Sequence, residues 1–168
     1  MLPPLQPPDS FHLEAAKGWL GLGNHIEAKE ELDKITVKLR AHPQVLDGRW
    51  QICAAAKKWE TAIDIAATII QLVPEEPLGW IYRSYALHEL KRTAEARDNL
   101  LCVMNKFPGI AVFPYNLACY ECQLGSLEQA KRWLEKAFKL GDAKDMRRAA
   151  LDDPDLQPLW KKIGGPKA

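Results

Sequence analysis

A period of 34 residues runs through most of this chain and constrains its fold more than any other feature. Alanine recurs at Ala28, Ala62, Ala96 and Ala130, each 34 residues after the one before. Apolar or small residues recur four and seven positions after each alanine, and a glycine or lysine stands five positions before it. Several columns that share one fixed period indicate repeated supersecondary units stacked on one another.

Each unit has the pattern of a helical hairpin. Small and apolar residues at spacings of three and four mark one face of a helix. Pro74 and Pro108 each close a unit, and Pro43 and Pro77 each open the next one. Proline ends a helix or occupies its first turn, where its missing N–H costs nothing. The alanine column suits a close approach of two helices. The sequence therefore predicts an all-α chain.

These columns resemble the tetratricopeptide repeat. The four units fall at 9–42, 43–76, 77–110 and 111–144. Residues at the family's positions are Ala16, Trp19, Gly23, Ala28 and Leu32 in the first unit, Trp80, Ser84, Ala96, Leu100 and Pro108 in the third, and Leu117, Ala118, Gly125, Ala130, Leu134 and Ala137 in the fourth. The resemblance implies a right-handed α-solenoid of four helix–turn–helix units with C-terminal capping helices.

The second unit departs from the family pattern in its first helix. Arg49 and Trp50 occupy columns in which the family has leucine and a small residue. We expect either that the two helices of this unit splay apart or that Trp50 turns outward.

The segments outside the repeats have distinct expected roles. Residues 1–8 are rich in proline and predict an extended, mobile leader, residues 145–163 predict capping helices, and residues 164–168 predict a frayed tail. Asp142 is expected to begin one short helix, and Asp153 with Pro154 to begin a second that turns Leu156, Leu159 and Trp160 inward. The segments 115–120, 124–125, 151–156 and 158–160 resemble the terminal unit of bacterial tetratricopeptide proteins. Such a segment would cover the last apolar face of the array.

No motif of a known catalytic or cofactor site is present in the sequence, so we expect no enzyme activity and no cofactor. Cys119 and Cys122 have a spacing that could hold zinc or form a redox pair, with His88 as a further ligand. Both cysteines fall in the middle of a predicted helix, and zinc needs four ligands. Packing is the expected role of these two thiols, and no metal site is predicted. The acidic segment around Asp153 and Asp155 lacks calcium-loop spacing and is interpreted as helix caps and solvated charge.

Charge and composition narrow the function class. Lysine and arginine number 23 and aspartate and glutamate 22, for a net charge of +1. A dedicated nucleic-acid binder normally has a strong basic excess, so we expect no nucleic-acid partner. No apolar run is long enough for membrane insertion, and the first residues lack the features of a secretory signal. Four cysteines suit a reducing compartment, which predicts a cytoplasmic protein.

The resemblance also implies a function, namely binding of a peptide or helix of a partner protein in the concave groove of the array. Groove positions fall mainly on the first helix of each unit. The candidate groove residues are Leu13, Lys17, Gln51, Leu78, Ile81, Tyr82, Tyr85, His88, Val112, Tyr115, Asn116, Cys119 and Cys122. Some members of the family grip a C-terminal carboxylate with a set of lysine, asparagine and arginine residues. Only Lys17 matches that set here, which predicts no preference for acidic C-termini.

Two interpretations of this surface remain open. Tyrosines and aliphatic residues in the last two units have the composition of a binding patch for a protein partner. The chain's own termini could instead fold back and fill the groove. The corresponding functions are a protein-interaction scaffold and a self-associating structural protein that forms homo-oligomers.

Overall fold

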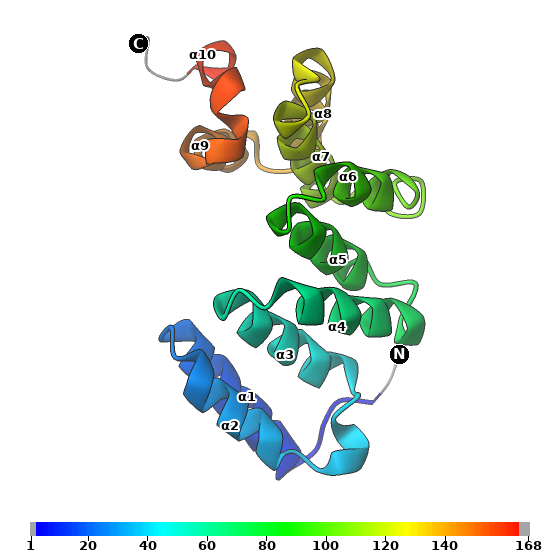
Figure 1. Ribbon diagram of the computed structural model, residues 1–168, viewed down its shortest axis with the longest axis vertical. Helices are drawn as coiled ribbons and strands as arrows, with labels where there is room; N and C mark the ends of the chain where they lie inside the picture. The colour runs from blue at the N-terminus through cyan, green and yellow to red at the C-terminus, as the bar shows by residue number, and fades with distance from the viewer. Residues whose placement is uncertain (1–2, 165–168) are drawn as a thin grey trace. The chain divides into compact units, whose positions relative to one another are not determined.

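The computed structural model describes residues 3–164, and every regular element in that range is helical. Eight α-helices follow one another as four consecutive pairs: α1 (Asp9–Gly21) and α2 (His25–Lys34), α3 (Pro43–Ala55) and α4 (Trp59–Leu72), α5 (Leu78–Glu89) and α6 (Thr93–Leu101), and α7 (Val112–Gln123) and α8 (Leu127–Leu140) (Figure 1). Within the units, α1 packs on α2, α3 on α4, and α7 on α8. A short 3-10 helix, η1 (Val37–Leu39), follows α2. The chain ends with α9 (Ala143–Asp152), the 3-10 helix η2 (Pro154–Leu159) and α10 (Trp160–Ile163). It divides into two compact units, unit 1 (Met1–Ala86) and unit 2 (Leu87–Ala168).

The repeated alanines are fully buried in the second helix of each pair. Ala28, Ala62, Ala96 and Ala130 are all 0% exposed. The apolar column four residues later, which holds Leu32, Ala66, Leu100 and Leu134, is buried as well. Two helices of a pair pack closely only where the side chains between them are small or interdigitate. The 34-residue period therefore marks one buried helix face that recurs once in each repeat.

The turn between paired helices also repeats. The residue five positions before each alanine has a positive φ: 76° at Gly23, 54° at Lys57, 62° at Lys91 and 81° at Gly125. A left-handed residue after the last helical turn satisfies free carbonyl groups and reverses the chain. Glycine adopts this conformation without a steric penalty, which explains why glycine recurs in this column.

The start of the chain is tied to unit 1 by specific contacts. Leu5, within the predicted leader, is buried in a core cluster with Leu13 and Val45. Asp9, at the start of α1, accepts hydrogen bonds from the backbone N–H (2.6 Å) and the hydroxyl (3.1 Å) of Thr36. Part of the leader thus contributes to the core, which its proline-rich sequence did not predict.

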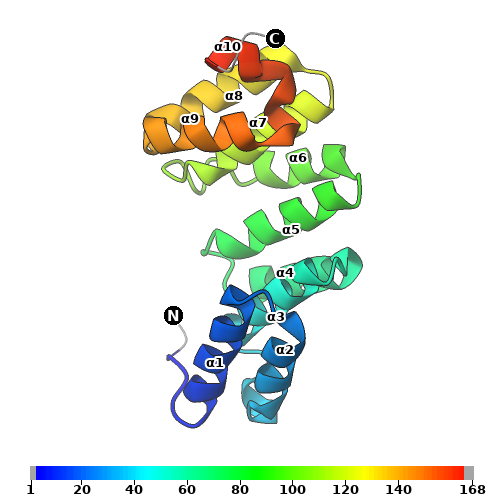
Figure 2. The same cartoon turned by 90° about the vertical axis from the view of Figure 1, so that its left-hand side faces the viewer.

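The end of the chain packs on α7 and α8 in unit 2 (Figure 2). Asp142 caps α9 by accepting from the N–H groups of residues 144 and 145. Asp153 caps η2 in the same way, through the N–H of residue 155. Leu156 and Leu159 are fully buried, and the Trp160 indole donates to the carbonyl of Ala150 at 2.9 Å. The second capping element is a 3-10 helix, and residues 165–168 of the predicted frayed tail lie outside the described residues.

Candidate protein-interaction surface

Trp50 points into unit 1, which excludes one of the two expected alternatives, an outward Trp50. Its ring is 7% exposed and stacks on Tyr82 of α5, with ring centroids 3.8 Å apart and planes 2° from parallel. Alanines at 62, 66 and 86 lie in the same cluster. Their small side chains leave the volume that a tryptophan needs in a position normally held by a small residue.

Tyr82 is fixed in place by a polar network on the outer edge of this stack. Its hydroxyl donates to Asp47 Oδ1 at 2.5 Å, and the Gln51 side-chain amide donates to the same oxygen at 2.9 Å. Burial raises the pKa of the Tyr82 phenol well above its usual value, and the nearby Asp47 carboxylate raises it further. Tyr82 therefore joins α3 to α5 as a neutral hydrogen-bond donor.

Tyr85 is the most exposed aromatic residue of this cluster, at 42%. Its ring meets the edge of Trp50 at a centroid distance of 6.1 Å and lies 5.8 Å from the ring of Trp59. Packing against two tryptophans restricts the Tyr85 side chain while one side of it stays accessible. The remaining unit 1 candidates on these helices, Leu78 and Ile81, are half-buried.

The two candidates on α1 differ in accessibility. Leu13 is 3% exposed and belongs to the core cluster of unit 1, so it is corrected from a groove residue to a core residue. The helix α1 turns this position toward α2 and α3, with which it packs. Lys17 is exposed and pairs with Glu14 at 2.7 Å, three residues earlier on the same helix.

In unit 2, the chain's own tail covers most of the candidate surface on α7. Tyr115 donates its hydroxyl to Asp153 at 3.1 Å, and the Cys119 thiol lies 3.5 Å from the same carboxylate. Burial, together with the negative charge of Asp153, raises the pKa of both groups far above their usual values. Burial and then the carboxylates of Asp155 and Asp153 raise the pKa of Cys122 to about 11.

His88 provides a second attachment for the tail. One ring nitrogen lies 2.9 Å from Asp155 and the other 3.1 Å from the hydroxyl of Thr93. Its ring also packs beside Tyr120, with centroids 4.9 Å apart. The Gln123 side chain donates to the Asp155 carbonyl at 3.1 Å. Sequence reasoning treated Asp153 and Asp155 as caps and solvated charge. Each also binds a side chain on the predicted groove, and no periodic signal marks that contact.

Two candidates on α7 remain outside these tail contacts. Val112 is 39% exposed, and Asn116 is half-buried. His88, Cys119 and Cys122 are 7%, 5% and 6% exposed. The structure thus brings the unit 2 candidates together, but it buries these three and ties Tyr115 to the tail.

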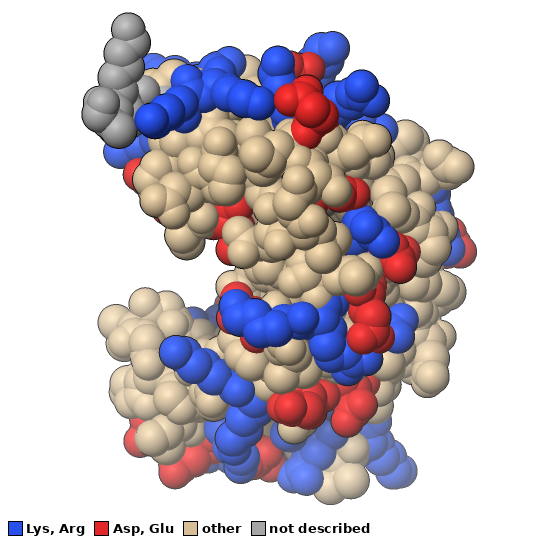
Figure 3. All heavy atoms as spheres, turned by 45° about the horizontal axis from the view of Figure 1, so that its top comes forward, with Lys and Arg blue, Asp and Glu red and all other residues tan. Residues whose placement is uncertain are grey.

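Within residues 3–164, no group of three or more histidine, cysteine, aspartate or glutamate side chains could hold a metal ion. In the described part of the chain, no helix is both long and apolar enough to cross a membrane. On the face shown in Figure 3, lysine and arginine side chains lie among aspartate and glutamate side chains.

The arrangement of helices has clear counterparts among solved structures. MamA MSR-1 C2 superimposes with a TM-score of 0.65 at 18% identity, covering 81% of this chain and 78% of that one. MamA RS-1 ArsTM double mutant gives a TM-score of 0.67 at 13% identity, covering 84% and 79%. MamA AMB-1 P212121 gives 0.61 at 18% identity, covering 79% and 72%.

The fold is a helical solenoid of the tetratricopeptide type. At these identities the likeness shows the fold alone. The sequence matches no protein-family model, and no significant match is found among curated proteins.

Proposed function

We propose that this chain is a protein–protein interaction module that binds a peptide or helix of a partner protein and acts as a scaffold, without catalysis. The fold supports this proposal, since stacked helical hairpins offer extended surfaces made by the first helix of each pair. The four cysteines form no disulfide. Free thiols persist in reducing compartments, which supports a cytoplasmic setting for this role.

The aromatic cluster around Tyr85 carries the proposal. Tyrosine offers a large contact area, loses little entropy on binding and has one polar tip. Here Tyr85 is held between Trp50 and Trp59 and still presents 42% of its surface. Anchoring contacts at protein interfaces are enriched in aromatic residues of this kind. Lys17, Gln51, Leu78 and Ile81 supply further polar and aliphatic contacts on the first helices of unit 1.

The role of the unit 2 candidates follows from the tail. We assign His88, Tyr115, Cys119 and Cys122 to holding Asp153 and Asp155 in place. Val112 and Asn116 are left as contacts available to a partner on α7. A partner that binds the covered part of α7 would first displace the tail and its buried leucines, which makes this part of the surface the less accessible one.

A capture experiment with matched variants tests the proposal. Tagged wild-type chain, Tyr85→Ala and Phe11→Ala are exposed to a lysate of the source organism, and retained proteins are purified for direct binding. Phe11 is 67% exposed on α1 and serves as the control for loss of an exposed aromatic ring. We expect a partner that binds wild type and Phe11→Ala and loses at least tenfold in affinity with Tyr85→Ala. Equal affinity for all three folded proteins would contradict the proposal.

Self-association is the second candidate, and a specific observation favours it. Large apolar side chains are exposed near the two ends of α1: Phe11 at 67% and Leu22 at 77%. Apolar surface exposed to water favours association, because its burial gains free energy in proportion to the area covered. In unit 2, the tail contacts occupy the part of α7 that a foreign peptide would otherwise bind. A self-associating protein whose groove is filled by its own chain would have this arrangement.

A further inference from the structure

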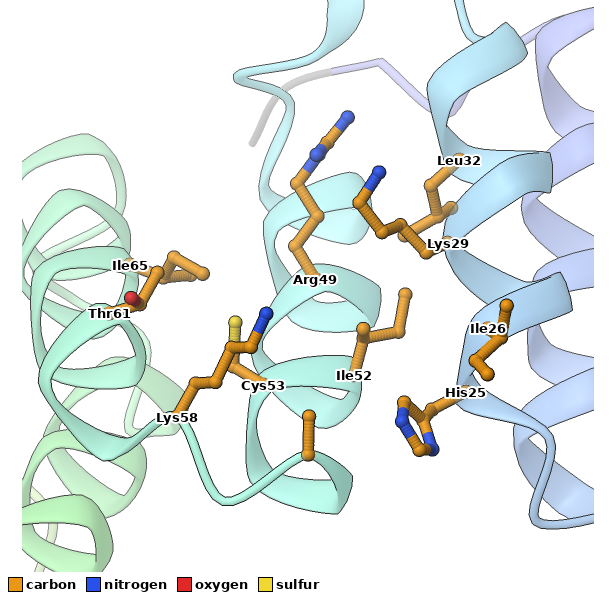
Figure 4. Close-up of a pocket in the computed structure, with 11 residues that line it drawn as sticks. His25, Ile26, Lys29, Leu32, Arg49, Ile52, Cys53, Lys58, Thr61 and Ile65 are labelled. Atoms are coloured by element: carbon orange, nitrogen blue, oxygen red, sulfur yellow. The ribbon is translucent and has the colours of Figure 1, made fainter.

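Unit 1 also contains a hollow, which shares Cys53 and Ile65 with the cluster around Trp50. It has a volume of about 440 Å³ and is lined by α2, α3 and α4 (Figure 4). Ligand pockets commonly have volumes of roughly 300–1,000 Å³. On α3, Arg49 and Cys53 face this hollow. Helical spacing places Asp47 and Gln51 on the opposite side of the same helix. The basic residues of the hollow lie outside the Trp50 cluster, so they can be altered without changing Trp50, Tyr82 or Tyr85.

The walls of the hollow are aliphatic. Ile26 and Leu32 come from α2, Ile52 from α3 and Ile65 from α4. Ile26 is 64% exposed, which leaves a large apolar side chain in water at the rim. Covering it would gain hydrophobic free energy in proportion to the area removed from water.

The rim of the hollow is basic. Lys29, Arg49 and Lys58 line it together with His25, and none of the lining residues is acidic. Figure 4 shows Lys29 and Arg49 approaching each other from α2 and α3, while Lys58 extends from the turn before α4. Asp33 binds Lys29 at 2.5 Å and Arg49 at 3.0 Å. One carboxylate between two cations leaves a net positive charge.

Lys58 adds a positive charge that forms no ion pair within residues 3–164. Its side chain also makes no hydrogen bond with another residue in that range. It is also the residue before α4, and it provides no side-chain cap for that helix. The first N–H groups of a helix carry partial positive charge and favour anions. The hollow thus combines an apolar interior with an edge of net positive charge.

We propose that this hollow docks an acidic amphipathic helix of a partner protein. Its aliphatic face would pack on Ile26 and Ile52, and its flanking carboxylates would pair with Lys58 and with the Lys29–Arg49 edge. Amphipathic helices bind apolar grooves in this way, and opposite charges on the rim set orientation and rate of association. The site extends the proposed function to a second surface and does not depend on Tyr85.

A pair of synthetic peptides tests the charge requirement. The probe is an acetylated, amidated and fluorescein-labelled 18-residue helix with leucine on one face and glutamate on its flanks. A second peptide replaces each glutamate with lysine. We expect the full-length chain to bind the glutamate peptide and to bind the lysine peptide at least about tenfold more weakly. Lys58→Glu should weaken binding of the glutamate peptide about fivefold. Lys38→Glu, at an exposed lysine outside the hollow, should leave the affinity for the glutamate peptide unchanged.

Alkylation of Cys53 reports occupancy at the hollow itself. This thiol lines the hollow, and Cys102 is exposed elsewhere and serves as an internal control. The glutamate peptide should protect Cys53 and leave Cys102 reactive. Equal binding of both peptides, equal weakening by both lysine variants, or no binding at millimolar peptide would each overturn the proposal. Protection of Cys53 by decanoate but not by the peptide would also overturn it, in favour of a small carboxylate ligand.

Discussion

At the residue scale, two lysines take a backbone conformation that glycine takes in the equivalent turns. Lys57 and Lys91 have φ values of 54° and 62°, in line with Gly23 and Gly125. A side chain in this region costs about 1 kcal/mol or more relative to glycine. We expect Lys57→Gly and Lys91→Gly each to raise the free energy of unfolding by about 0.5–1 kcal/mol, measured by urea titration.

The reverse substitution provides the control for these turns. Gly125→Ala should lower the free energy of unfolding by about 1 kcal/mol, because a Cβ atom is added at a φ of 81°. A loss of stability on Lys57→Gly would contradict the argument and would mean that the lysine side chain contributes more than the backbone strain removes.

Single residues also show where sequence reasoning succeeds and fails. The alanine column could be identified because each turn of the array reuses the same buried site, which repeats in the sequence. Trp50 could not be placed, since the residues that accommodate it are Ala62, Ala66 and Ala86 on two other helices. A family pattern describes the usual occupant of a column. It does not register that Ala66 stands in a column where the other three units have leucine, which leaves room for the indole.

At the element scale, contact of the tail with α7 makes unit 2 sensitive to high pH. The folded state raises the pKa of Cys122 from 9.0 to about 11, through burial and the carboxylates of Asp155 and Asp153. A group whose pKa is higher in the folded state binds its proton more tightly there. Its contribution to stability is complete below pH 9 and declines as the pH rises toward 11.

We therefore expect the free energy of unfolding of unit 2 to be constant from pH 7 to 9 and to fall between pH 9 and 11. Urea titrations followed by the fluorescence of Trp160, with the other tryptophans replaced, would measure it. Cys122→Ala removes one of the contributing groups and should flatten the decline. An identical decline in wild type and Cys122→Ala would exclude this thiol as a cause.

Helix limits and tail contacts differ in how well sequence predicts them. The repeat spacing and the cap residues predicted the hairpins and the starts of α9 and η2, because capping is a local interaction. The hydrogen bond from Tyr115 to Asp153 joins residues 38 positions apart in the chain. A single contact of this kind leaves no period in the sequence. The covered surface on α7 therefore needed the structure.

At the scale of the whole molecule, the sequence predicted a solenoid, and the superposition on MamA structures over about four fifths of the chain shows that fold. Function is less constrained, because one helical array serves many partners. Net charge does not exclude self-association, because a charge of +1 provides almost no electrostatic repulsion between copies of the chain. Exposed Phe11 and Leu22 add apolar surface. The oligomeric state is therefore the property that separates the two proposed functions.

Light scattering coupled to gel filtration measures that state directly. For an interaction module with a free surface in unit 1, we expect a monomer of 19.0 kDa, unchanged over a hundredfold range of concentration. A self-associating protein would instead show about twice this mass. Phe11→Ser combined with Leu22→Ser should then restore the monomer, while Val37→Ser, at another exposed apolar residue, should not. A dimer that survives the double substitution would show that the contact between copies lies away from α1. It would also contradict the argument that Phe11 and Leu22 drive association.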